Sequence, residues 1–144
     1  MPNTPTVLSL SPLPAMALQN FMQPYLGQRK VSIVAAVDHP PEQLGKLLNE
    51  ADILLGDFTF NQLINADVIS KLSKVKLIQQ PSVGYQHIDI ETCKQKNIPV
   101  ANAAGANTLS VAEHTLMLAL VLMKKTLYFH QQTSSGNWAQ MDAF

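Results

Sequence analysis

The chain has 144 residues, of which 47% are hydrophobic, and its ten basic and ten acidic residues give a formal net charge of zero. This length suits one domain with its own core, and the absence of a large positive field argues against nucleic acid or an anionic membrane as partner. No apolar run reaches the roughly 20 residues of a membrane span, no basic segment starts a secretory signal, and the lone cysteine, Cys93, fits a soluble cytoplasmic protein.

Short apolar runs alternate with segments whose apolar residues have helical spacing. In chain order we predict a strand over residues 6–10, a helix over 15–27, and then, alternately, strands and helices over 30–37, 38–51, 52–58, 65–73, 76–83, 88–97 and 98–105. Asp89 can cap the helix that contains Cys93, which we interpret as a small core residue. The alternation indicates an α/β fold, a doubly wound sheet of five parallel strands that binds ligands at the carboxyl ends of its strands.

A long and strongly apolar helix is predicted over residues 110–128. The polar stretch after it, from residue 129 to residue 144, is typical of a connector. Ser110 and Glu113 match the Ser-x-x-Glu capping box, so we expect Glu113 to cap this helix rather than to act as an acid or base. Asn107 and Thr108 lie just before it, beside a helix N-terminus that favours anions.

The fourth predicted strand ends at Ser82-Val83-Gly84. Gly84 permits a backbone twist that would point successive N–H groups into one concavity, an arrangement that suits a carboxylate. An ordinary strand-to-helix loop, in which the glycine only eases a tight turn, remains the alternative.

Several kinds of site lack support in the sequence. None of the four histidines has an acidic residue at a spacing that predicts a catalytic dyad, and His87 near Asp89 is the closest case. No two histidines or cysteines fall at metal-ligand spacing, so we expect no metal. The six glycines are widely scattered, and neither a Gly-x-Gly-x-x-Gly motif nor a Walker loop occurs.

Residues 75–125 resemble the N-terminal, substrate-binding domain of the D-isomer-specific 2-hydroxyacid dehydrogenases. Three motifs carry the resemblance in the family's order: "GYQHID" from Gly84, "IPVANAAGAN" from Ile98 and "SVAEHT" from Ser110. Residues 1–74 agree more loosely. The resemblance implies a flavodoxin-like domain, a nicotinamide cofactor (NAD or NADP), and hydride transfer between a 2-keto acid and its D-2-hydroxy acid.

The resemblance also implies roles for individual residues. The loop from Ser82 to Tyr85 would hold the substrate carboxylate through the amides of Val83 and Gly84. Asn107 would face the substrate and the nicotinamide, and Thr108 would touch the cofactor.

The sequence departs from the family at Gln86, Asn97 and Ala104. Asn97 can take the left-handed conformation that ends a helix. Gln86 and Ala104 lie on the expected site loops and leave the substrate preference open.

In this family the glycine motif and the catalytic arginine, acid and histidine belong to a second, Rossmann-type domain that follows the long helix. We therefore expect residues 1–109 to form the substrate-binding domain, 110–128 the interdomain helix, and 129–144 the start of a connector to an absent cofactor domain. On that reading this chain holds no catalytic residue, binds no cofactor and is inactive alone.

Two alternatives to a dehydrogenase fragment remain. One is a stand-alone binding or regulatory module of the same family, similar to its transcriptional corepressors. The other is an unrelated flavodoxin-like protein, such as a receiver or flavin carrier. It is disfavoured because only Asp57 is placed for a receiver's acidic cluster and no phosphate-binding loop is present. Leu116, Leu120 and Met123 share a helix face that predicts a homo-oligomer, a dimer or larger, through residues 110–128.

Overall fold

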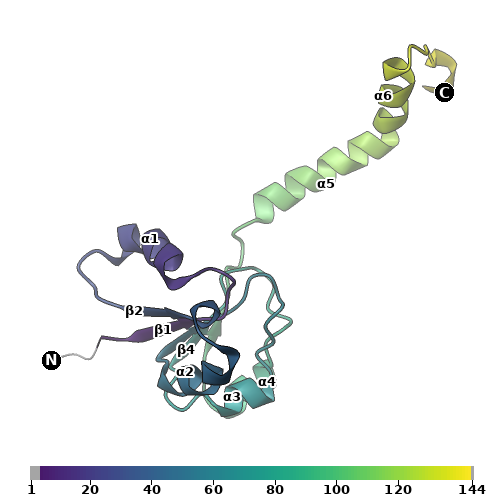
Figure 1. The fold of residues 1–144 in the computed structure, drawn as a ribbon. Helices are drawn as coiled ribbons and strands as arrows, with labels where there is room; N and C mark the ends of the chain where they lie inside the picture. The colour runs from purple at the N-terminus through teal and green to yellow at the C-terminus, as the bar shows by residue number, and fades with distance from the viewer. Residues whose placement is uncertain (1–3, 144) are drawn as a thin grey trace. The chain divides into compact units, whose positions relative to one another are not determined.

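The computed structural model describes residues 4–143 and divides after Ala104 into two compact units (Figure 1). The first unit is built on a sheet of five parallel strands in the order β2-β1-β3-β4-β5. The strands are β1 (Thr6–Ser9), β2 (Ser32–Ala35), β3 (Ile53–Leu55), β4 (Leu77–Gln79) and β5 (Val100–Ala101). This strand order is that of the flavodoxin-like folds and confirms the predicted fold class.

Helices cover both faces of this sheet. They are α1 (Ala15–Leu26), α2 (Leu44–Glu50), α3 (Ala66–Ser70) and α4 (Ile90–Gln95), with the 3-10 turns η1 (Ala36–Asp38) and η2 (Pro41–Gln43) before α2. In Figure 1, α1 lies on one face and α2, α3 and α4 lie on the other. The main core lies between the sheet and the layer of α2, α3 and α4. It includes Leu8, Leu54 and Ile78 of the strands and Leu48, Ile69 and Cys93 of the helices. Cys93 is therefore the core residue that the sequence predicts.

Both ends of α4 follow from its sequence. The Asp89 carboxylate accepts hydrogen bonds from the Thr92 amide (3.0 Å) and the Thr92 hydroxyl (2.7 Å), which confirms the predicted cap. Asn97 ends the helix in the left-handed conformation with φ 56°, also as predicted. The amide of Ile98 then bonds to the carbonyl of Cys93 at 2.9 Å and closes a Schellman motif between two buried side chains.

The second unit contains α5 (Thr108–Met123), α6 (Thr126–Ser134) and the 3-10 helix η3 (Gln140–Ala143). The prediction of one helix over residues 110–128 is wrong at both ends. Lys125 has φ 50° and separates α5 from α6, which extends into the stretch expected to be a connector. The amide of Val111 already bonds to the carbonyl of Asn107, so the helix begins before Ser110.

The predicted capping box at Ser110 and Glu113 is therefore also wrong. The residue before α5 is Asn107, whose side chain makes no capping hydrogen bond, and Ser110 lies inside the first helical turn. A cap requires a residue outside the helix, so the Ser-x-x-Glu spacing is coincidental here.

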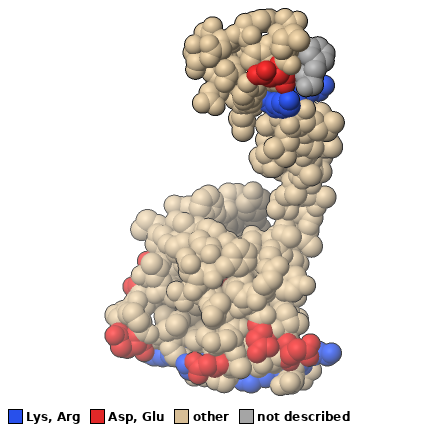
Figure 2. All heavy atoms as spheres, turned by 90° about the vertical axis from the view of Figure 1, so that its right-hand side faces the viewer, with Lys and Arg blue, Asp and Glu red and all other residues tan. Residues whose placement is uncertain are grey.

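The two units differ in their surfaces. In Figure 2, charged side chains of the first unit gather over the layer of α2, α3 and α4, whereas α5 is almost uncharged along its length. Large apolar side chains of α5 are exposed, among them Leu109, Leu116, Leu120, Leu122 and Met123. No helix among residues 4–143 is long and apolar enough to cross a membrane.

Candidate carboxylate-binding site

In the loop after β4, every backbone carbonyl from Ser82 to Tyr85 accepts a hydrogen bond. The Ser82 carbonyl accepts a hydrogen bond from the Ala103 amide (3.0 Å), and the Val83 carbonyl accepts one from Asn102 Nδ2 (2.7 Å). The Gly84 carbonyl accepts one from the Ser82 hydroxyl (3.1 Å), and the Tyr85 carbonyl accepts one from the amide of Ile88 (3.0 Å). Hydrogen bonds to its carbonyls thus fix the backbone of this loop.

The donors of the same loop are free. Within residues 4–143, the amides of Val83, Gly84 and Tyr85 donate no hydrogen bond. Val83 and Tyr85 are exposed and Gly84 is half-buried. A backbone N–H needs a partner, and an anionic oxygen is a strong acceptor for one. The amides of three of the predicted site residues, Val83, Gly84 and Tyr85, are thus available to a ligand, and the site itself stays a prediction.

The reason for a glycine at position 84 differs from the one predicted. Gly84 is absent from the positive-φ residues of the described chain, so the backbone-twist explanation is wrong. A Cβ added at Gly84 would lie 2.9 Å from Gln86 Oε1 and 3.1 Å from Phe60 Cζ. The glycine therefore permits close approach of the Phe60 ring.

Asp57, at the end of β3, organises the neighbouring loop. Its buried carboxylate accepts hydrogen bonds from the Thr59 amide (2.8 Å), the Thr59 hydroxyl (2.7 Å), the Asn61 amide (3.0 Å) and the Gln62 amide (3.1 Å). Burial raises the pKa of Asp57, but these hydrogen bonds outweigh it and the pKa is lowered overall. The loop holds Phe60 at φ 62°, and its ring packs against Gly84.

His87 is buried beside this loop. Its ring meets the Phe60 ring edge to face at 4.9 Å. Burial lowers the pKa of His87, and the charge of Asp57 opposes that shift. Neither ring nitrogen has a hydrogen-bond partner within residues 4–143, and the carboxylate of Asp89 caps α4 instead. The structure therefore forms no His87–Asp89 dyad.

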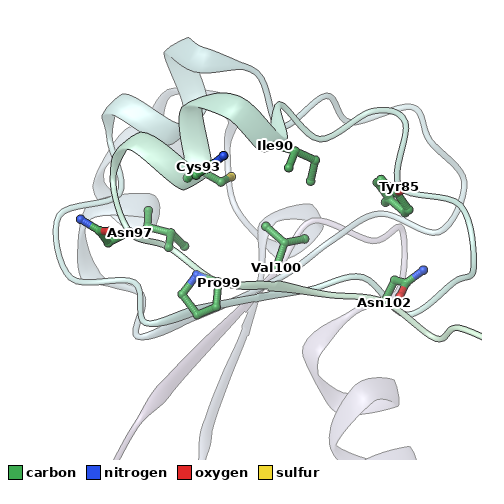
Figure 3. Close-up of a pocket in the computed structure, with 9 residues that line it drawn as sticks. Tyr85, Ile90, Cys93, Asn97, Pro99, Val100 and Asn102 are labelled. Carbon is green, nitrogen blue, oxygen red and sulfur yellow. The ribbon is translucent and has the colours of Figure 1, made fainter.

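A cavity of about 670 Å³ lies beside the loop, between α4 and β5. Figure 3 shows Ile90 and Cys93 on the helix side, Val100 on the strand side, and Tyr85 and Asn102 at one end. The amides of Val83 and Gly84 do not line this space, which adjoins the loop through Tyr85 and Asn102. Burial raises the pKa of the Cys93 thiol, and the charge of Asp89 adds to this, so the thiol is a neutral wall group.

Asn107 and Thr108 begin α5 in the second unit. Both are exposed, and neither side chain makes a hydrogen bond within the described chain. Their predicted contacts with substrate and cofactor remain predictions.

Sequence reasoning missed the residues that shape the loops, namely Asp57, Phe60, Gln80 and Asn102. One signal was available, because Asp-x-Thr directly after a strand is typical of a side-chain-capped turn. The roles of Phe60, Gln80 and Asn102 depend on contacts between segments that are distant in the sequence.

Comparison with known proteins identifies the family of this chain. Residues 7–143 match the family model described as D-isomer specific 2-hydroxyacid dehydrogenase, catalytic domain. Formate dehydrogenase 1 of Saccharomyces cerevisiae is 29% identical over 126 residues, which cover 85% of this chain and 32% of that protein. The chain spans a quarter to a third of the length of the curated relatives it matches.

Solved structures show the same fold. D-Lactate dehydrogenase from Aquifex aeolicus, complexed with NAD and lactic acid, superposes with a TM-score of 0.72 at 28% identity over 93% of this chain and 38% of that one. NAD-dependent formate dehydrogenase from Staphylococcus aureus, in complex with NAD, gives 0.67 at 26% identity over 96% and 44%. The family match spans nearly the whole chain, which therefore belongs to the D-isomer-specific 2-hydroxyacid dehydrogenase family.

Proposed function

We propose that this chain is the substrate-binding portion of an NAD(P)-dependent dehydrogenase, and that the amides of Val83 and Gly84 bind the carboxylate of its substrate. The observation that carries the proposal is the loop from Ser82 to Tyr85. Its carbonyls are all engaged while the amides of Val83, Gly84 and Tyr85 are free. Such a loop has free donors for an anion, while each of its carbonyls already accepts a hydrogen bond from within the chain.

The proposed substrate is a small 2-keto or D-2-hydroxy acid. A single carboxylate is the shared chemistry of lactic acid, which is bound in the Aquifex aeolicus structure, and of formate, after which several relatives are named. The amide loop recognises that group and leaves the rest of the substrate to other residues. Phe60, which is partly exposed beside Gly84, supplies an apolar surface next to it.

The remaining steps belong to the longer protein that we propose. NAD or NADP would supply or accept the hydride when bound, and the exposed Thr108 side chain, free of hydrogen bonds in the described chain, would be available to contact it. Asn107 would face the substrate. The residues of this chain hold the carboxylate in a fixed orientation, which is the contribution of positioning to catalysis. We propose that the chain alone is inactive and that the protein is cytoplasmic.

The test is a titration of the ¹⁵N-labelled 144-residue chain with pyruvate, followed by NMR. We expect saturable shifts of the Val83, Gly84 and Tyr85 amide signals. Methyl pyruvate, which has the same keto group and no charge, is the matched control and should leave these signals in place. Shifts confined to other residues, or equal shifts with the ester, would overturn the proposal.

A further inference from the structure

Gln80, the residue after β4, joins the two loops at this end of the sheet. Its side chain is fully buried, and Nε2 donates to the carbonyl of Asp57 (3.2 Å) and to the hydroxyl of Ser82 (2.7 Å). The Ser82 hydroxyl in turn donates to the carbonyl of Gly84 (3.1 Å). Because a hydroxyl has one hydrogen, accepting from Gln80 and donating to Gly84 fixes the direction of both bonds.

These bonds orient the free amides. A peptide unit is planar, so the direction of a carbonyl fixes the direction of the N–H of the following residue. The hydrogen bond from the Ser82 hydroxyl to the Gly84 carbonyl therefore fixes the direction of the amide N–H of Tyr85. In the same way, the hydrogen bond from Asn102 Nδ2 to the Val83 carbonyl fixes the direction of the amide N–H of Gly84.

Gln80 is an unfavourable choice for packing alone. Its Oε1 is buried and has no hydrogen-bond partner within residues 4–143, which costs stability. A Cβ at Gly56 would overlap this oxygen, so position 56 must be glycine to accommodate it. A leucine would fill the same space without an unpaired oxygen. What glutamine adds is its pair of N–H donors.

We propose that the amide of Tyr85 is a third donor to the carboxylate, that Gln80 and Ser82 act together as a positioning relay that orients this amide, and that Asn102 is a second, separate clamp that orients the amide of Gly84. This inference rests on the proposed function. The relay touches no substrate; it acts by holding the Gly84 carbonyl, while Asn102 holds the Val83 carbonyl.

The experiment measures the dissociation constant for pyruvate by the same NMR titration in variants of the full chain. Gln80→Leu and Ser82→Ala should each weaken binding by about three- to tenfold, the effect of one net hydrogen bond. The double variant should be no weaker than either single one, because the two residues form one relay. Ser82→Thr keeps the hydroxyl and should retain wild-type affinity.

Two further variants separate positioning from folding. Asn102→Leu combined with Ser82→Ala should weaken binding more than Ser82→Ala alone, since Asn102 orients another peptide unit. Gly56→Ala should displace Gln80 and weaken binding, whereas Gly45→Ala, in open space on α2, should leave it unchanged. Urea unfolding of each variant reports stability, which a purely structural role would change without changing the dissociation constant.

The outcomes are distinct for the two proposals. Wild-type affinity in both Gln80→Leu and Ser82→Ala, or purely additive losses in the double variant, would overturn the relay while leaving the carboxylate site intact. If Gln80→Leu does not fold, Ser82→Ala against Ser82→Thr decides the matter alone. Absence of loop shifts in the wild-type chain would instead reject the carboxylate site, and the relay with it.

Discussion

Buried polar side chains gather at one place in this fold. Within residues 4–143 they are Ser9, Ser11, Asp57, Gln80 and His87. Four of them lie at or just beyond the carboxyl ends of β1, β3 and β4, the edge where parallel sheets bind ligands, and His87 packs against Phe60. Elsewhere the interior of the first unit is apolar. At the residue scale, Asp57 and Gln80 shape the two loops around Gly84, whereas Ser9 and Ser11 bond to each other.

His87 makes stability depend on pH. Its pKa is lowered in the folded chain, chiefly by burial, relative to about 6.5 in an unfolded one. As pH falls below that value the unfolded state takes up a proton first, so the stability present at neutral pH is progressively lost. We expect the free energy of unfolding, measured with urea, to decrease from pH 7.5 to pH 5 less in His87→Phe than in the wild-type chain.

The matched control for His87 is His114→Gln, a change on the exposed surface of α5. This variant should keep the full wild-type decrease. An identical decrease in His87→Phe would show that the buried imidazole does not determine the pH dependence.

At the scale of single elements, helix ends decide where the chain turns. The first-unit helix α4 has a side-chain cap at Asp89 and a left-handed end at Asn97. The second-unit helix α5 has no side-chain cap, and Lys125 in the left-handed conformation follows its end. The amide of Lys125 bonds to the carbonyl of Leu122 at 3.1 Å, as the amide of Asn97 bonds to that of Lys94 at 3.0 Å, so α5 ends in the same local left-handed turn as α4.

The cap of α4 gives a prediction for this scale. Asp89→Ala removes two hydrogen bonds to Thr92 and should lower the free energy of unfolding, as the loss of a helix cap does. Urea denaturation measures the change. Glu91→Ala removes a charge in the same turn without removing the cap, and a loss as large as that of Asp89→Ala would contradict the assignment.

The order of strands and helices in residues 4–104 could be predicted from the sequence because apolar runs and helical spacing are local signals. The exact ends of these strands and helices could not be predicted. A strand was expected over residues 30–37, but pairing stops at Ala35, where the chain turns into η1. The loop at Ser82 to Tyr85 was found through its motif, whereas the contacts of Gln80, Phe60 and Asn102 join segments more than 15 residues apart. No local pattern records such contacts.

At the scale of the whole molecule, α5 is the unusual feature. Its apolar residues point in all directions, and no residue of the helix is buried. A helix that is hydrophobic all round belongs in an interior. We propose that copies of this chain cover one another's α5, as a dimer or a larger assembly.

Sedimentation velocity tests this self-association. We expect the wild-type chain to form a dimer or a larger species whose share rises with concentration, and the variant Leu116→Lys with Leu120→Lys to shift toward monomer. Met16→Lys, which changes an even more exposed apolar side chain on α1, should leave the distribution unchanged. A wild-type chain that stays monomeric at the highest concentrations would exclude the proposed assembly.

The strand order also bears on how the polypeptide is made. β1 lies between β2 and β3, and its first partner, β2, is complete only once residue 35 has been synthesised. From there β3, β4 and β5 add to one growing edge in the order in which they leave the ribosome. Each later strand meets a template that already exists. The sheet of the first unit can therefore assemble strand by strand as the chain emerges, and the loop after β4 is fixed last, when Asn102 and Ala103 have followed.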